Sequence, residues 1–216
     1  MLNLLLQATL MTLGLGVASL IGGLILAILF SAAELSGKRW MGWPVALLTS
    51  LVRGLPEILV VLFLYFGSTQ VLFLITGDYV EFSPFACGVL ALSLLFASYA
   101  SQTLRGALNA VPMGQRQAAW ALGLGRSHTF LRIVLPQAWR HAIPGLGNQW
   151  LVLLKDTALV SLIGVNDLMH QAQLVSASTY QPFTWYAIAA LIYLVISLCS
   201  EWLLGMATRY TRRYGG

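Results

Sequence analysis

The sequence predicts an all-α membrane protein, a polytopic bundle of five transmembrane helices, and two observations carry this prediction. The first is composition: of 216 residues, 58% are hydrophobic and only 9% are charged, and the mean hydropathy is +0.80. Soluble domains carry about 25% charged residues, so these side chains could not cover an aqueous surface. We therefore exclude a free cytosolic enzyme, a disordered chain and a disulfide scaffold.

The second observation is a set of five apolar runs, each near the ~20 residues that a helix needs to cross the hydrocarbon core. The expected spans cover residues 8–33, 44–66, 84–104, 143–163 and 184–206. The apolar run 71–75 is too short to span, so it is expected to be a loop or an extension of the second helix. We treat residues 1–216 as one transmembrane domain.

Lysine and arginine concentrate in alternate loops, which predicts the orientation of the chain. Ten of the twelve follow the first, third or fifth span: Lys38, Arg39, Arg105, Arg116, Arg126, Arg132, Arg140, Arg209, Arg212 and Arg213. The loops 67–83 and 164–183 contain none. By the positive-inside rule the C-terminus is cytoplasmic and the N-terminus lies on the outer side of the membrane. The net charge of +5 is thus read as a topology signal rather than as a sign of nucleic-acid binding.

Two basic residues, Arg53 and Lys155, lie inside expected spans, each close to an acid. Ionisable groups within a membrane are costly and usually mark a polar path or a partner contact. Arg53 and Glu57 could instead form an i,i+4 ion pair on one helix face. Asp156 could likewise pair with Lys155 or with a partner helix.

A polar, basic segment at 112–136 separates the third and fourth spans. It has helix formers at 115–122, then Gly123 and Gly125, then a second helical stretch at 127–135. This pattern predicts two short helices joined by a glycine turn and lying along the cytoplasmic membrane surface. It fits either a docking element for another protein or an amphipathic surface hairpin.

The segment resembles the EAA loop in permease subunits of binding-protein-dependent ATP-binding-cassette importers. That pattern is Glu-Ala-Ala, three residues, Gly, nine residues and Ile-x-Leu-Pro. The matching residues here are Gln117, Ala118, Ala119, Gly123, Ile133, Leu135 and Pro136, with Gln117 as the one departure. The resemblance implies a MetI-like permease fold with a coupling-helix hairpin. It assigns ATPase coupling to Gln117, Ala118, Ala119, Gly123 and Ser127.

Further segments are similar to the polar amino-acid branch of that family, above all to arginine permeases. They are Arg53–Pro56 with Leu64–Gly67, Leu104–Ala107, Gly145–Gln149 and Leu154–Leu159. The resemblance implies a bacterial inner-membrane transport subunit for arginine or basic amino acids, with histidine, lysine, ornithine or glutamine as alternatives. The implied partners are a second homologous permease, two ATPase subunits that bind ATP and Mg²⁺, and a periplasmic amino-acid-binding protein, besides membrane lipid.

Gly54 and Pro56 interrupt the second span near its middle. Proline removes a backbone donor, and freed backbone groups are tolerated at membrane depth only against protein or a wet cavity. Free amides there would suit the α-carboxylate of an amino acid, although a simple packing kink would break the helix equally well. A carboxylate at Glu57 would suit the guanidinium or ammonium group of a basic substrate.

Asp156 is the expected partner of the substrate α-ammonium, because a carboxylate pairs strongly with such a cation. The resemblance supports Asp156 and Thr157 in this role. Gln149 lies seven residues earlier, two helical turns away, on the same face. The expected substrate-binding residues are Gly54, Pro56, Glu57, Gln149, Lys155, Asp156 and Thr157.

No enzyme motif is present in the sequence. It lacks GxxxxGK[ST], HExxH and GxSxG, so we expect no catalytic residues, no metal site and no cofactor in this chain. A stand-alone proton-coupled carrier with Asp156 and Glu57 as relay is an alternative, as is an intramembrane enzyme or assembly factor. The carrier gives the 112–136 pattern no use, and the missing catalytic pair weighs against the enzyme.

Overall fold

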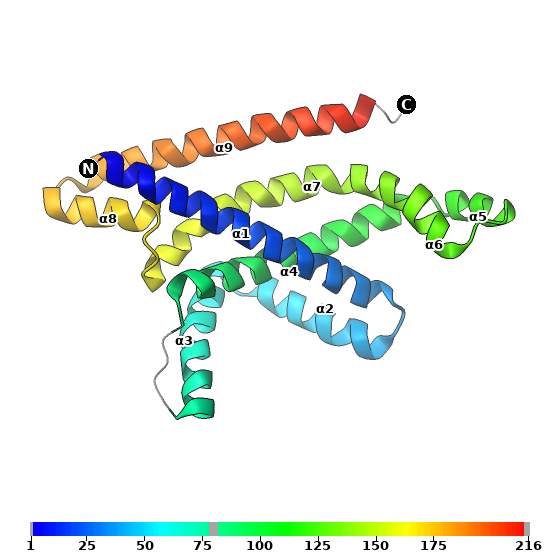
Figure 1. Cartoon of the computed structure of the whole chain (residues 1–216), viewed down its shortest axis with the longest axis horizontal. Coiled ribbons are helices and arrows are strands. Elements are labelled where there is room, and N and C mark those ends of the chain that lie inside the picture. The colour runs from blue at the N-terminus through cyan, green and yellow to red at the C-terminus, as the bar shows by residue number, and fades with distance from the viewer. Residues whose placement is uncertain (1, 78–81, 214–216) are drawn as a thin grey trace.

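The computed structural model describes residues 2–77 and 82–213. All regular elements in these ranges are helical, as predicted (Figure 1). They are α1 (Leu2–Leu35), α2 (Arg39–Gly54), α3 (Glu57–Thr76), α4 (Pro84–Ala110), α5 (Met113–Ala121), α6 (Arg126–Thr129), the π turn η1 (Phe130–Val134), α7 (Leu135–Asp156), the 3-10 helix η2 (Thr157–Ile163), α8 (Leu168–Thr179) and α9 (Pro182–Arg213).

Four of the described helices are long and apolar enough to cross a membrane. They are Asn3–Leu35, Glu57–Ile75, Pro84–Ala110 and Pro182–Met206. The first, third and fifth expected spans are therefore confirmed as single helices. The fourth expected span lies in α7 and η2, which carry more polar residues and pack against α4.

The expected second span, 44–66, is wrong as a single helix. Helix α2 ends at Gly54, and Leu55 is extended, with φ −98° and ψ 148°. Proline disfavours helical backbone in the residue before it, so Pro56 ends α2 and begins α3. In Figure 1, α2 lies along the bundle whereas α3 projects away from it. Residues 71–75 extend α3, which confirms the second of the two expectations for that run.

The second arm of the 112–136 segment also differs from expectation. It is not a separate helix over 127–135, because α6 runs through the π turn η1 directly into α7. Pro136 comes just after the π turn, so its missing N–H falls where the α-helical hydrogen-bond pattern changes. The hairpin is therefore continuous with a long helix of the bundle.

Helix α4 forms the centre of the bundle, and small residues let its neighbours approach closely. A Cβ at Gly22 of α1 would lie 2.7 Å from Ser93 Oγ, and one at Gly88 would collide with Val160 of η2. Ser93 Oγ also donates to Ser19 O at 3.1 Å. In lipid no hydrophobic driving force holds helices together, so close packing at small residues supplies much of the attraction between them.

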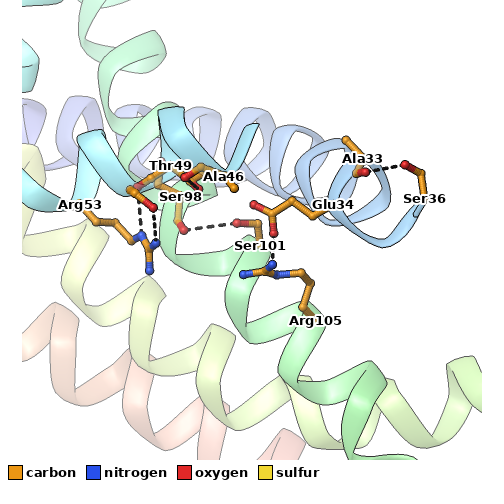
Figure 2. A network of polar contacts seen from close by, with 10 residues as sticks. Ala33, Glu34, Ser36, Ala46, Thr49, Arg53, Ser98, Ser101 and Arg105 are labelled. Carbon is orange, nitrogen blue, oxygen red and sulfur yellow. Dashed lines mark hydrogen bonds and ion pairs between the residues drawn. The ribbon is translucent and has the colours of Figure 1, made fainter. Parts of the chain in front are cut away.

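Polar contacts lie near the ends of α1 and α2 and along α4 (Figure 2). Glu34, with its side chain buried, forms an ion pair with Arg105. Arg53 donates from Nε to Thr49 O at 3.0 Å within its own helix. The alternative Arg53–Glu57 ion pair is not formed in the described part of the chain, because the break at Pro56 puts the two residues on different helices.

Candidate substrate pocket and coupling hairpin

A small pocket of about 170 Å³ lies between the start of α3, the middle of α4 and the end of α7. At ~30 Å³ per water molecule, it has room for a small polar molecule. Its lining residues are Glu57, Leu95, Phe96, Tyr99, Gln149, Val152, Leu153 and Asp156. The structure thus brings together three of the expected substrate-binding residues, Glu57, Gln149 and Asp156, from segments far apart in sequence.

The local structure explains why these three side chains meet. Glu57 is the first residue of α3, directly after the break. Gln149 and Asp156 are two turns apart on one face of α7. On α4, Leu95 and Tyr99 lie one turn apart and supply part of the wall.

The polar chemistry of the pocket is dominated by acceptors. Glu57 and Asp156 are carboxylates that accept hydrogen bonds when ionised. Gln149 Oε1 is buried and has no hydrogen-bond partner among the described residues. In the described ranges no lysine or arginine lines the pocket. The arrangement therefore suits a cationic ligand rich in donors.

Gly54 and Pro56 lie beside the pocket rather than in its lining. Both are exposed, and Pro56 O accepts from Leu59 N at 3.0 Å and Val60 N at 3.3 Å. The residues of α3 that come before Leu59 have N–H groups with no carbonyl partner within the helix. The break thus leaves backbone donors next to Glu57.

Lys155 and Thr157 point elsewhere. Lys155 is exposed and lines a separate, larger cavity of about 620 Å³ with Tyr186 and Tyr193 of α9. Thr157 is fully buried and donates to Leu154 O at 2.7 Å, which fixes the turn where α7 passes into η2. A Lys155–Asp156 ion pair is not formed within the described residues.

Two polar groups near the pocket end of the bundle escaped the sequence analysis. Thr103 Oγ1 accepts a hydrogen bond from Gln149 Nε2 at 2.8 Å. Asp167 is fully buried and caps α8, accepting from His170 N at 2.9 Å through Oδ1. Aspartate before an apolar helix is a common N-cap signal, so Asp167 could have been found. The Thr103 contact joins residues 46 positions apart, and no local pattern predicts it.

The coupling hairpin, which we define as residues 112–129, presents most of its expected contact residues to the outside. Gln117, Ala118, Gly123 and Ser127 are exposed, whereas Ala119 is buried. At the tip, Leu122 is 81% exposed. Gly123 adopts a left-handed φ of +80°, a conformation that favours glycine.

The hairpin is fastened to α4 and α7, two of the three helices that line the pocket. Arg116 donates from Nη2 to Leu108 O at 3.2 Å, near the end of α4, and α6 continues through η1 into α7. Next to the hairpin, Val111, Val134 and Ala138 form a small buried apolar cluster that joins the end of α4 to η1 and α7. A force applied to the hairpin would thus reach α4 and α7 together.

The comparisons with known proteins agree with this architecture. The family described as "Binding-protein-dependent transport system inner membrane component" matches residues 19–213. The arginine ABC transporter permease protein ArtQ of Haemophilus influenzae is 59% identical over 212 residues, which cover 98% of this chain and 95% of that protein. The histidine/lysine/arginine/ornithine permease HisQ of Salmonella typhimurium is 35% identical, covering 98% and 93%.

Solved structures give the same result for the fold. A crystal structure of an amino acid ABC transporter with histidines has a TM-score of 0.86 at 29% identity, covering 96% of this chain and 94% of that one. An inward-facing MetNI methionine ABC transporter has a TM-score of 0.71 at 15% identity, covering 97% and 95%. The fold is of the MetI-like permease type. The chain belongs to the family of inner membrane components of binding-protein-dependent transport systems.

Proposed function

We propose that this chain is the transmembrane permease subunit of an ATP-driven uptake system for arginine and other basic amino acids. The observation that carries the proposal is the pocket in which Glu57, Gln149 and Asp156 converge with no basic residue in its described lining. The two similar permeases are named for arginine and for histidine, lysine, arginine and ornithine, which supports the same substrate class.

In this pocket the substrate is held at both ends. Asp156 binds the α-ammonium group, and the unbonded N–H groups at the start of α3 bind the α-carboxylate, which the positive end of a helix favours. Glu57 and Gln149 Oε1 accept hydrogen bonds from the guanidinium. Each of the two cationic groups of arginine then faces one carboxylate, so no unpaired cation lies in the membrane.

The proposed partners follow from the surfaces that the chain leaves open. Of the apolar spans, α9 and α3 are the least buried, and they are available to lipid and to a second, homologous permease that completes the pathway. The exposed hairpin residues Gln117, Ala118, Gly123 and Ser127, with Ala119 beneath them, dock on one of two ATPase subunits. A periplasmic amino-acid-binding protein delivers the substrate.

The mechanism is alternating access. ATP and Mg²⁺ bind only to the ATPase subunits, whose closure draws the hairpins together. Because Arg116 joins the hairpin to α4 and α6 continues through η1 into α7, this movement reaches the pocket and opens it outward, and hydrolysis resets it. Affinity inside the pocket is weak, since a tightly held substrate would not leave. The N-terminus is periplasmic and the C-terminus cytoplasmic in the bacterial inner membrane.

Reconstitution tests this function. The complete complex in proteoliposomes should take up labelled arginine only with ATP and the binding protein present. Unlabelled lysine, ornithine or histidine should compete if the system serves basic amino acids generally, whereas glutamine should not. Uptake by this chain alone without ATP would instead favour the proton-coupled carrier and would contradict the proposal.

A further inference from the structure

The side chain of Gln149 is held in one orientation by a residue outside the pocket lining. Gln149 Nε2 donates to Thr103 Oγ1 at 2.8 Å, and the Thr103 hydroxyl is 3.5 Å from Tyr99 O, to which it donates. The threonine oxygen is therefore the acceptor in the pair. Gln149 lines the pocket, and with Nε2 engaged its buried carbonyl Oε1 is the atom of the amide left without a hydrogen-bond partner among the described residues.

Close packing of α4 on α7 makes this contact possible. Gly145 lies one turn before Gln149, and a Cβ there would lie 2.6 Å from Thr103 Cγ2. Real Cβ atoms do not approach so closely, so only glycine lets α4 come near enough for the threonine to reach the amide. The contact is thus built into the helix packing.

We propose that Thr103 is a specificity-determining positioning residue, which holds Gln149 so that the pocket presents acceptors only. This inference rests on the proposed function and refines it. A guanidinium carries five N–H donors and no acceptor, so it can satisfy Glu57 and Gln149 Oε1 together while Asp156 holds the α-ammonium group. A ureido group of the same shape, as in citrulline, has only three N–H donors and a carbonyl oxygen, and this oxygen leaves unpaired whichever acceptor it faces.

Loss of the threonine hydroxyl should change selectivity rather than merely weaken binding. Without Thr103 as acceptor, the Gln149 amide is free to rotate and to donate from Nε2 toward Glu57 or Asp156. Rotation removes one acceptor for guanidinium and supplies a donor for a ureido oxygen. Arginine binding should weaken while citrulline binding improves.

The test measures arginine and citrulline binding to the purified complete complex by calorimetry, without the binding protein. Thr103→Val should lower the arginine-to-citrulline affinity ratio about three- to tenfold, the worth of one hydrogen bond. Thr103→Ser keeps the hydroxyl and should preserve the ratio. Thr69→Val is the matched control, because the Thr69 hydroxyl donates to Tyr65 O of its own helix at 3.2 Å and Thr69 does not line the pocket.

A second variant keeps the test decisive if Thr103→Val does not assemble. Gln149→Met removes the amide and should lower the ratio by itself, and Thr103→Ser in that background should change nothing further. An unchanged ratio in Thr103→Val, or in Gln149→Met, would overturn the role of Thr103. Unchanged arginine affinity in Glu57→Gln would instead overturn the proposed function, so the two failures are distinguishable.

Discussion

The pocket and the coupling hairpin are joined by the same two helices, α4 and α7, but they are built in opposite ways. The hairpin is one continuous stretch whose side chains point outward, with Leu122 at its exposed tip. The pocket is assembled from three distant segments, and its polar groups face inward. Recognition and movement should therefore be separable: changes in the pocket alter substrate affinity, and changes in the hairpin alter turnover.

The largest expected effect is the loss of pocket charge. Glu57→Gln or Asp156→Asn should weaken arginine binding to the complete complex about 10- to 100-fold, because each removes a charge-assisted hydrogen bond. ATPase coupling should stay intact at saturating arginine. Glu201→Gln, an exposed acid of α9 that lines a different cavity, is the matched control and should bind arginine normally.

The hairpin variant should show the reverse pattern. Gly123→Val places a branched side chain at a φ of +80°, which costs about 1–2 kcal/mol and distorts the tip. Uptake and stimulated ATPase activity should fall about tenfold, with arginine affinity unchanged.

Gly125→Val adds the same side chain two residues away, where φ is −66° and space is open. This variant should couple normally. A loss of arginine affinity in Gly123→Val would show that pocket and hairpin are not separable.

A third prediction concerns the packing of α4, one of the pocket helices, on η2, and it changes no polar group. A Cβ at Gly88 would collide with Val160, so Gly88→Ala should cost about 1–3 kcal/mol of unfolding free energy. Thermal unfolding of the purified complex in detergent measures this cost. Val160→Ala should restore most of the loss when combined with Gly88→Ala, and an additive loss would contradict the contact.

The smallest effect is expected at Lys155. The Lys155 side chain lines the cavity with Tyr186 and Tyr193 rather than the pocket, so Lys155→Met removes no contact with the substrate and should change arginine affinity less than about twofold. The complex should still bind arginine by calorimetry. A tenfold change in arginine affinity would show that Lys155 does belong to the substrate site, as its position in the sequence predicts.

These two regions also show how much the sequence could predict. The hairpin is one continuous stretch of the chain, so its glycine turn and its alanines could be predicted from the local sequence. The continuity of α6 with α7 could not. In the pocket, Asp156 and Gln149 were readable from helical spacing, and Glu57 from its position after a helix-breaking proline. Tyr99 and Thr103 were not, because their roles arise only where α4 packs against α7. The division of the second span depended on whether Pro56 kinks or ends the helix, which hydropathy does not distinguish.

The central claim is that arginine binds in the pocket between α3, α4 and α7. An electron cryomicroscopy structure of the complete complex with saturating arginine tests it most directly. The account predicts ligand density in contact with Glu57, Gln149 and Asp156. Density for arginine elsewhere in the pathway, with this pocket empty, would contradict it.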